Sequence, residues 1–458
     1  MKLSFHNSLL LGALLFCGGC VTGRELTYDH TVQVVKRPVN GMAELGWRVK
    51  TFWSEEMVSF WRRRISFPLL RHRDIPELSS EEQFMNPAVM DRWLRQKTGP
   101  PVQGTANLLF NGETFFSRLE ESILTATNRI ELKAYIFDND DVAVEIAKRL
   151  KKRSHDITIR LLYDSGGSRA SWGTDAPSLP PGYIYETDDM INYLSSGANI
   201  QLRRAGHTLL TSEHSKYIII DDTAAYFGGM NIGREYRYDW RDAMFELTGP
   251  VIDALEIRFE RAWILADGGP LTFFKLPKPT ASEYPQDGDL YLIGTTPFKA
   301  HLYKAQLRAI KHARKVVYIE NPYLWNPAVI YQLCAARKRG VDVRVTIPRD
   351  VNHDIGISAN KLTVSRLREH GVRVFIYPGM THVKAAVYDQ WACFGSANFD
   401  DLSLHKNYEL NIFTDNPQIV REIREDLLEE GQRCSVEIFD ADDLSRMEIF
   451  IARFAQYL

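Results

Sequence analysis

One pattern of polar and apolar residues occurs twice in this chain of 458 residues. The first copy, HSKYIIIDDTAAYFGGMN, begins at His214, and the second, HVKAAVYDQWACFGSAN, begins at His382. Each copy has a His and a Lys separated by one residue, so on an extended strand both side chains point to the same face. A single His-x-Lys is most often an ordinary surface pair. The repetition instead predicts two equivalent hairpins that face each other across one shared site.

The residues after each His-x-Lys predict a buried strand, a turn and a second strand. Apolar residues lead to Asp221 in the first copy and to Asp389 in the second, and we expect both aspartates to have a structural role at the turn. The second strand then ends in small residues and an Asn. Glycine lets backbone N–H groups approach a ligand closely, and Asn adds a side-chain donor. These positions are Gly228, Gly229 and Asn231 in the first copy and Gly395, Ser396 and Asn398 in the second.

Two facing hairpins would place paired imidazoles, ammonium groups and amides around one pocket. Such a set suits a phosphodiester, because Lys and Asn neutralise the phosphate oxygens as charge builds on them. One imidazole can attack phosphorus while the other protonates the departing alcohol oxygen. Since the cations already fill the role of a Lewis acid, we expect neither a metal nor an organic cofactor. The residues concerned are His214, Lys216, Asn231, His382, Lys384 and Asn398.

Both copies match the His-x-Lys-x4-Asp signature of the phospholipase D superfamily. The stretches GGMNIGREYRYDWRD (Gly228 to Asp242) and GSANFDDLSLHKNYEL (Gly395 to Leu410) resemble the bacterial cardiolipin synthases. The second copy departs from the family at Leu402, where an Arg is usual, and in its shorter gap from Asp389 to Gly395, which predicts a shorter turn. The resemblance implies an α/β fold of two pseudo-symmetric α/β/α halves that share one active site.

The resemblance also implies a mechanism through phosphohistidine, with attack by His214 and proton donation by His382. In relatives a carboxylate downstream of each motif orients the imidazole. Here Asp242 lies 28 residues after His214 and Glu409 lies 27 after His382, so we expect each acid to orient the His of its own half. Three other acidic residues are expected to lie at the rim or to cap helices: Glu235, Asp400 and Asp401.

The activity implied in this way is phosphatidyl transfer between phospholipids, above all the synthesis of cardiolipin from phosphatidylglycerol. If water is the acceptor, the protein is instead a phospholipase D that releases phosphatidic acid. A membrane-tethered phospholipid-binding module and a nuclease are further alternatives. The net charge of −2 gives no whole-chain reason to expect nucleic acid as a partner. Whether an accessory protein contributes specificity is left open.

The first twenty residues have the composition of an export signal. Lys2 precedes an apolar run from Leu9 to Cys17, and Cys20 after a Gly pair resembles the acylation site of bacterial lipoproteins. We therefore expect a signal peptide over residues 1–20, lipid on Cys20 and a position in the cell envelope facing the periplasm, at the outer rather than the inner membrane. A plain secretory peptide and an uncleaved anchor are the alternatives.

The rest of the chain divides at changes in composition. Residues 21–103 predict a linker with amphipathic helices. One of them, rich in aromatic residues from Trp47 to Trp61, either lies on a membrane surface or packs on the catalytic body. The two halves occupy residues 104–267 and 290–458, and a linker rich in Pro and Gly separates them at 268–289.

Three further features concern the halves themselves. An internal duplication aligns them with Ile130 opposite Val316. Extra residues at 165–185 predict a long loop that is either a lid or a surface excursion. From Asp442 an amphipathic helix either packs on the body or touches membrane, and Cys334 and Cys393 are expected in the core.

Overall fold

A computed structural model describes residues 66–80, 83–205, 211–266, 288–297, 299–352, 354–439 and 445–455. Several predictions concern residues outside these ranges: the signal peptide, lipidation of Cys20, the aromatic-rich helix before residue 65, and most of the linker at 268–289. No helix of the described ranges is both long and apolar enough to cross a bilayer.

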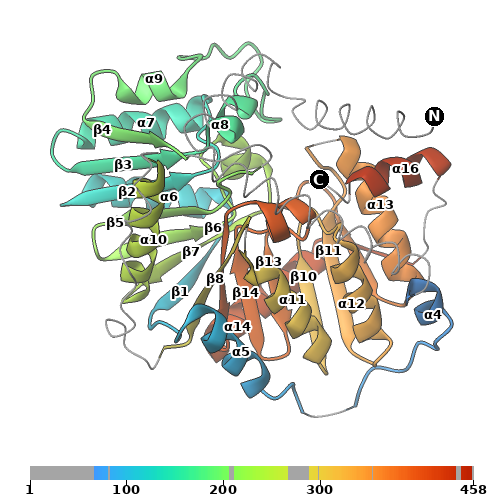
Figure 1. Ribbon diagram of the computed structural model, residues 1–458. Coiled ribbons are helices and arrows are strands. Elements are labelled where there is room, and N and C mark those ends of the chain that lie inside the picture. The colour runs from blue at the N-terminus through green and yellow to red at the C-terminus, as the bar shows by residue number, and fades with distance from the viewer. Residues whose placement is uncertain are drawn as a thin grey trace, which may run out of the picture.

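The first half forms a seven-stranded sheet in the order β1-β7-β6-β5-β2-β3-β4 (Figure 1). Strands β2, β3 and β4 pair in parallel, and the other pairings are antiparallel. The strands are β1 (Thr105–Phe110), β2 (Arg129–Ala134), β3 (Thr158–Tyr163), β4 (Ile200–Arg204), β5 (Lys216–Ile220), β6 (Ala224–Gly228) and β7 (Ala243–Thr248).

The second half repeats this topology and adds one strand at each edge. Its nine-stranded sheet has the order β16-β12-β11-β10-β13-β14-β15-β8-β9, with β10, β11 and β12 in parallel. Without β9 and β16, the order matches that of the first sheet strand for strand, which confirms the two pseudo-symmetric halves. The strands are β8 (Leu290–Thr296), β9 (Lys299–Ala300), β10 (Val316–Glu320), β11 (Asp342–Pro348), β12 (Arg373–Tyr377), β13 (Ala385–Tyr388), β14 (Trp391–Gly395), β15 (Glu409–Thr414) and β16 (Val436–Ile438).

Helices cover both sheets, so each half is an α/β/α layer as expected. The outer helices of the first half are α6 (Gly112–Thr125), α7 (Asp141–Arg153) and α9 (Met190–Ser195). Those of the second half are α11 (His301–His312), α12 (Pro327–Arg337) and α13 (Asp354–Glu369). Between the two sheets lie α10 (Val251–Ala266), α14 (Pro417–Glu422) and the π-helical η5 (Ile423–Glu429), which runs into the short α15 (Glu430–Arg433).

The two halves share a hydrophobic core as well as a site. In β5, Tyr217 and Ile219 belong to the central core between the sheets, whereas Ile218 and Ile220 belong to the outer core of the first half. This alternation follows from the two-residue period of a strand that is buried on both faces. The rings of Phe245 and Phe394, one from each sheet, lie 3.9 Å apart between centroids. The halves are therefore two parts of one folding unit.

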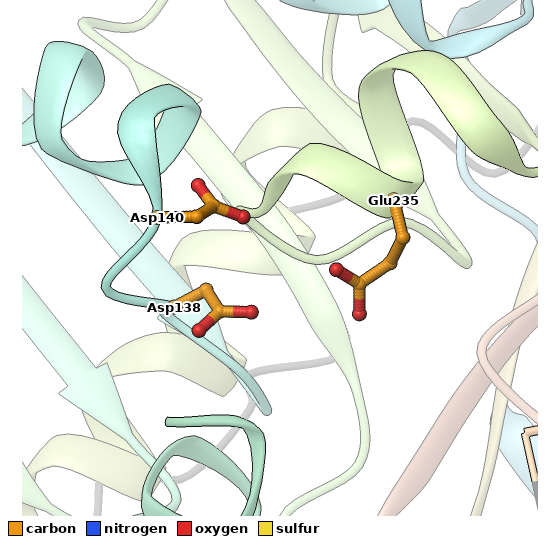
Figure 2. Close-up of side chains that lie close together, drawn as sticks. All are labelled: Asp138, Asp140 and Glu235. Atoms are coloured by element: carbon orange, nitrogen blue, oxygen red, sulfur yellow. The ribbon is translucent and has the colours of Figure 1, made fainter. Parts of the chain in front are cut away.

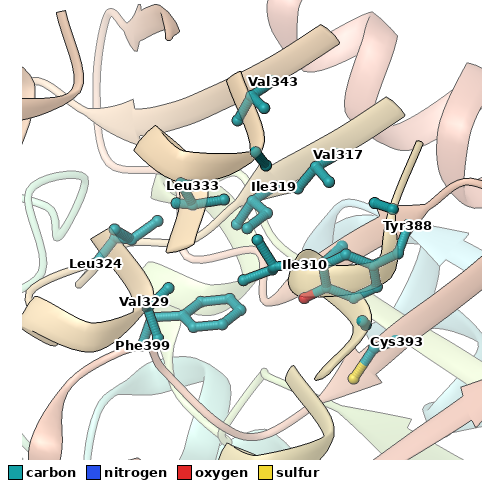
Figure 3. Close-up of a cluster of buried hydrophobic side chains, with 14 of the residues drawn as sticks. Ile310, Val317, Ile319, Leu324, Val329, Leu333, Val343, Tyr388, Cys393 and Phe399 are labelled. Atoms are coloured by element: carbon teal, nitrogen blue, oxygen red, sulfur yellow. The ribbon is translucent and has the colours of Figure 1, made fainter. Parts of the chain in front are cut away.

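The outer core of the second half contains both predicted core cysteines. Cys334 on α12 is fully buried and Cys393 on β14 is 1% exposed. Figure 3 shows Cys393 among apolar side chains that include Tyr388 and Ile310. Burial raises the pKa of the Cys393 thiol to about 12, so both cysteines behave as apolar core residues.

The register of the internal duplication differs slightly from the prediction. Strand β2 begins at Arg129 and β10 at Val316, so the equivalent of Val316 is Arg129 and not Ile130. The backbone confirms this pairing, because Asp221 N donates to Arg129 O and Asp389 N donates to Val316 O. The one-residue error arises because both faces of these strands are buried, so neighbouring positions do not differ clearly in polarity, whereas the backbone hydrogen bonds distinguish them.

The turn aspartates have the predicted structural role. Both have left-handed backbone, with φ of 49° at Asp221 and 54° at Asp389. The turn at Asp389 is shorter, since two residues separate β13 from β14 and three separate β5 from β6. The Asp221 carboxylate accepts from the backbone N–H groups of residues 127–129, where β2 begins. Each turn is thereby tied to the start of the neighbouring strand, which runs antiparallel to the strand before the turn.

Asp389 makes the stronger of these two anchors. Its buried carboxylate accepts from Arg314 N, Lys315 N and Val316 N at 2.9 Å, and also from Met85 N at 2.7 Å. Because Asp389→Ala leaves several buried donors without an acceptor, we expect it to lower the free energy of unfolding by about 3 kcal/mol or more. Asp221→Ala, at a more exposed turn, should lower the free energy of unfolding by about half as much. Urea unfolding of both variants measures the difference, and equal losses would contradict the role of burial.

The described part of residues 66–103 packs on the second half. The elements are α4 (Phe67–Arg71) and α5 (Ala88–Thr98), and the buried side chains of Met90 and Leu94 join the second outer core. Val102 then pairs with Leu290 at the start of β8. The described part of the predicted linker is thus a helical cover on the catalytic body, whereas the aromatic-rich helix for which two alternatives were given lies outside the described residues.

The C-terminal helix and the 165–185 segment also pack on the body. Helix α16 (Arg446–Ala455) lies beside α13, and Lys361 and Glu448 form an ion pair at 3.0 Å (Figure 1). The segment at 165–185 begins with helix α8 (Ser165–Ser171), so the prediction of a loop throughout was wrong. Asp164 caps this helix by accepting from Gly167 N at 2.9 Å, a signal visible in the sequence.

Candidate active site

A backbone contact between the halves positions the first motif. Glu213 forms a parallel bridge with Tyr408, and His214 N donates to Tyr408 O at 3.0 Å. Since Tyr408 directly precedes Glu409, this contact sets the first imidazole beside a carboxylate of the second half. His214 Nδ1 lies 2.8 Å from Glu409 Oε1, and the Glu409 side chain is fully buried.

The second motif is positioned by the equivalent contact. Arg241 bridges Thr381, and His382 N donates to Arg241 O at 2.7 Å. Asp242 follows Arg241, and its Oδ2 lies 2.6 Å from His382 Nδ1 with the side chain fully buried. The structure brings all four of these side chains together in one site.

The predicted pairing within each half, however, was wrong. We expected Asp242 to orient His214 and Glu409 to orient His382, whereas each carboxylate orients the imidazole of the other half. Within a half, His214 precedes β5 and Asp242 precedes β7, and β6 lies between these strands. Two strand spacings amount to about 10 Å, too far for a hydrogen bond. The two-fold relation of the halves brings the other carboxylate into reach.

The motif lysines are buried beside the imidazoles. Lys216 Nζ donates to His214 O at 2.6 Å, and Lys384 Nζ donates to His382 O at 2.8 Å. Burial lowers the pKa of Lys216 to about 7 and that of Lys384 to about 8. It also lowers the pKa of both imidazoles, that of His382 well below its usual range. A buried set of potential cations favours an anionic ligand, because the ligand would offset the loss of hydration.

The two motif asparagines are not equivalent. Asn231 Oδ1 accepts from Ile136 N at 3.0 Å, and its Nδ2 donates to Tyr236 Oη at 2.7 Å. Its amide is thus used within the first half. Asn398 is 6% exposed, and its Oδ1 has no hydrogen-bond partner among the described residues. Of the pair, the second amide is the one free to contact a ligand.

The predicted small residues support the carboxylates. Ser396 Oγ donates to Glu409 Oε2 at 2.5 Å and accepts from Leu410 N at 3.1 Å. At the equivalent place in the first half, a Cβ on Gly229 would lie 3.0 Å from Asp242 Oδ1. The Ser396 hydroxyl thus holds the Glu409 carboxylate, and the absence of a side chain at Gly229 leaves room for the Asp242 carboxylate.

Sequence reasoning missed one buried network behind each imidazole. Arg241 Nε donates to Glu320 Oε1 at 2.8 Å, and Glu320 also accepts from the Thr381 hydroxyl. In the first half Lys133 pairs with Glu213 at 2.9 Å, and Ser215 Oγ donates to Glu213 at 2.6 Å.

These networks hold the residues that flank each His. Register places Lys133 opposite Tyr217 and Glu320 opposite Ala385, so the two charged residues occupy equivalent positions in β2 and β10. A charged residue toward the end of each of these two strands was the available signal.

Three carboxyl groups lie close together beside the first motif (Figure 2). Asp138, Asp140 and Glu235 each offer an oxygen within 4.8 Å of the others, and burial raises their pKa values to about 7, 6 and 8. Asp140 caps α7 by accepting from Ala143 N, whereas Glu235, predicted at the rim, is half-buried on the π-helical η2 (Glu235–Asp239). Oxygen ligands at this spacing could hold a divalent cation.

The other two acids of this prediction differ from each other: Asp400 accepts a backbone hydrogen bond at the start of a helix, whereas Asp401 makes no side-chain capping bond. Asp400 Oδ1 accepts from Ser403 N at 2.7 Å, at the start of the π-helical η4 (Leu402–Lys406). Asp401 accepts from Asn326 Nδ2 at 2.6 Å. Both aspartates are buried, which places them inside the body and not at its rim.

The cluster of these three carboxyl groups predicts that the stability of the fold depends on pH. Their folded pKa values lie above the value of about 4 in the unfolded chain, so the folded state binds protons more tightly. The stabilisation is complete below about pH 4 and is lost as the pH rises through about 8. In the presence of a chelator, Asp138→Asn and Glu235→Gln should raise the Tm by a few degrees at about pH 8 and leave it nearly unchanged at about pH 4. The exposed Asp188→Asn is the control, and equal shifts at both pH values would contradict the prediction.

Comparison with known proteins agrees with this architecture. A family model described as cardiolipin synthase, PLD-like domain, matches residues 119–263 and 307–430. Cardiolipin synthase A of Pseudomonas fluorescens (strain SBW25) is 30% identical over 347 residues, which cover 71% of this chain and 68% of the relative. Cardiolipin synthase A of Pseudomonas syringae pv. syringae (strain B728a) is 30% identical over 392 residues, covering 81% and 73%.

A further relative is the cardiolipin synthase of Geobacillus sp. (strain WCH70), 29% identical over 343 residues that cover 72% of this chain and 66% of the relative. The chain thus spans about two thirds of the length of the curated relatives that it matches. The crystal structure of phosphatidylserine synthase from Haemophilus influenzae Rd KW20 superposes with a TM-score of 0.61 over 80% of this chain and 95% of that one. At 12% identity this is a likeness of fold alone. The duplicated motif, the two-half fold and the matched family model lead to one conclusion. The chain belongs to the phospholipase D superfamily and, within it, to the cardiolipin synthase family with a PLD-like domain.

Proposed function

We propose that this protein is a phosphatidyltransferase that makes cardiolipin from phosphatidylglycerol. The observation that carries the proposal is the pair of crossed contacts, His214 with Glu409 and His382 with Asp242, each beside a buried lysine. The relatives named cardiolipin synthase support the choice of substrate and acceptor.

The geometry suits a double displacement at phosphorus. A carboxylate on Nδ1 leaves Nε2 of each imidazole as the atom that reacts, and stabilises the cation that forms when that ring takes a proton. One imidazole attacks phosphorus and the other protonates the leaving glycerol oxygen. The second phosphatidylglycerol then gives its hydroxyl proton to the second imidazole and attacks the phosphohistidine. Lys216, Lys384 and Asn398 hold the phosphate oxygens as charge builds.

Product analysis tests the proposal directly. Purified protein in detergent is incubated with phosphatidylglycerol labelled in both glycerol groups, and the lipids and water-soluble products are separated. Equal amounts of cardiolipin and free glycerol support transfer. Phosphatidic acid without cardiolipin assigns the protein to hydrolysis, because water is then the acceptor. Binding of the lipid without any product assigns it to the binding-module alternative.

We further propose that the protein is a lipoprotein of the bacterial cell envelope, anchored through Cys20 and facing the periplasm. The support is the sequence of residues 1–20, which lie outside the described ranges. Cys20→Ser should move the protein from the membrane fraction to the soluble fraction and abolish incorporation of labelled fatty acid. Cys434→Ser, at an exposed cysteine, is the matched control. Unchanged labelling of the Cys20 variant would exclude acylation at this residue.

A further inference from the structure

The two halves of the site differ in the state of their imidazoles, although their topology is the same. In both rings the carboxylate lies on Nδ1, at 2.8 Å in His214 and 2.6 Å in His382. Nδ1 therefore carries a hydrogen, and the state of Nε2 distinguishes an attacking ring from a proton donor. An attacking ring needs a lone pair on Nε2, whereas a proton donor needs a hydrogen there.

Lys384 determines the state of His382. Its Nζ lies 2.8 Å from His382 Nε2 and the same distance from His382 O, so it faces the reactive side of the ring. An ammonium group has three donors and no acceptor. Nε2 must then present its lone pair to the ammonium, because a hydrogen on Nε2 would meet an N–H group of like charge. In the resting enzyme His382 is thus a neutral ring that cannot donate a proton from Nε2.

The first half lacks this contact. Lys216 Nζ donates to His214 O at 2.6 Å and lies 5.0 Å from the centre of the Tyr135 ring. No hydrogen bond joins Lys216 Nζ to His214 Nε2, both of which belong to the described part of the chain. Among the residues that the structure describes, no lysine contact therefore blocks His214 Nε2, and a bound phosphodiester, whose negative charge offsets the positive charge of Lys216, would let this ring carry a proton there.

The side-chain amides of the two motif asparagines also indicate that a phosphate binds on the His382 side of the site. Asn231 is held by Ile136 N and Tyr236 Oη, while Asn398 is buried and its Oδ1 has no partner in the described ranges. The free amide and the lysine on Nε2 both belong to the second half. A phosphate held by Lys384 and Asn398 would lie next to His382, where the attacking ring must be.

We infer that His382 is the nucleophile and His214 the general acid, the reverse of the assignment implied by the family resemblance. This inference rests on the proposed function. His382 Nε2 forms the bond to phosphorus while the bond from phosphorus to the leaving oxygen breaks. The leaving oxygen takes that electron pair and the proton from His214 Nε2. In the second step His214 takes the proton of the acceptor hydroxyl, the new oxygen bonds to phosphorus, and the electron pair of the N–P bond returns to His382.

Mass spectrometry of the trapped intermediate tests the assignment in the wild-type protein. The full-length enzyme is mixed with a p-nitrophenyl ester of phosphatidic acid, quenched under alkaline conditions that preserve phosphohistidine, and digested. We expect the phosphatidyl group on the peptide that contains residue 382. The group on residue 214 would overturn the inference and leave the proposed function intact. No adduct on either histidine, with no cardiolipin from phosphatidylglycerol, would contradict the proposed function itself.

Matched variants give a second readout with the same ester, whose phenolate leaves without a proton. His214→Ala should still release about one equivalent of p-nitrophenol per site in a burst, while its turnover of phosphatidylglycerol is lost. His382→Ala should give no burst with the ester. A burst from His382→Ala together with none from His214→Ala would establish His214 as the nucleophile. Circular dichroism of both variants shows whether each is folded.

Discussion

Alanine at either motif histidine is expected to lower kcat for phosphatidylglycerol by at least about 10⁴-fold. The reason is that attack on phosphorus and protonation of an alkoxide leaving group are both required for the natural lipid. Removal of either imidazole therefore blocks the same overall reaction, and the double variant His214→Ala/His382→Ala should be no worse than the single ones. The measurement is the initial rate of glycerol release from labelled phosphatidylglycerol.

The control for this prediction is His155→Ala, at an exposed histidine in the turn between α7 and β3. It should retain the wild-type rate within about twofold, since surface substitutions away from the site have small effects. Activity near the wild-type rate in either motif variant would exclude a site that uses both imidazoles.

Replacing the carboxylates by their amides should have the second-largest effect. Asp242→Asn and Glu409→Gln are each expected to lower kcat by about 10³ to 10⁴-fold, because an amide can hold the imidazole in the wrong tautomer and cannot stabilise its cation. Their side chains are buried and nearly the same size as the originals, so the fold should be retained. Steady-state kinetics should show the loss in kcat with little change in KM.

The crossed pairing makes this prediction more specific. In the burst assay with the p-nitrophenyl ester, Asp242→Asn should behave as His382→Ala does, and Glu409→Gln as His214→Ala does. This grouping holds whichever histidine attacks, because each carboxylate acts through the ring that it contacts. If Asp242→Asn instead shared the behaviour of His214→Ala, the carboxylates would act within their own halves and the crossed contacts would not be those of the working enzyme.

Much of the site could be predicted because it consists of residues close together in the sequence. The motif His and Lys, the turn aspartates and the small residues at the end of β6 and β14 all lie within one hairpin per half. Alternation along a strand and the left-handed turn at Asp221 and Asp389 are local properties, so a single sequence is enough to place them.

The inequality of the halves was not predictable in the same way. Asn231 and Asn398 look equivalent in the sequence, but only Asn231 meets a tyrosine hydroxyl and a backbone N–H of its own half. Likewise the two His-x-Lys pairs have the same spacing, yet Lys384 alone contacts the ring nitrogen of its histidine. These differences depend on side-chain positions set by packing against residues far away in the chain.

By itself the sequence determined the superfamily, the duplicated α/β topology and the membership of the site. Only the tertiary structure decided that His214 is oriented by Glu409 and His382 by Asp242, and that helices α4 and α5 cover the second half. Spacing along the chain specifies which strand of its own sheet a residue occupies, and so which neighbours it has there. It does not specify what faces that strand across the two-fold contact, because that contact forms only when two sheets bury their apolar faces against each other.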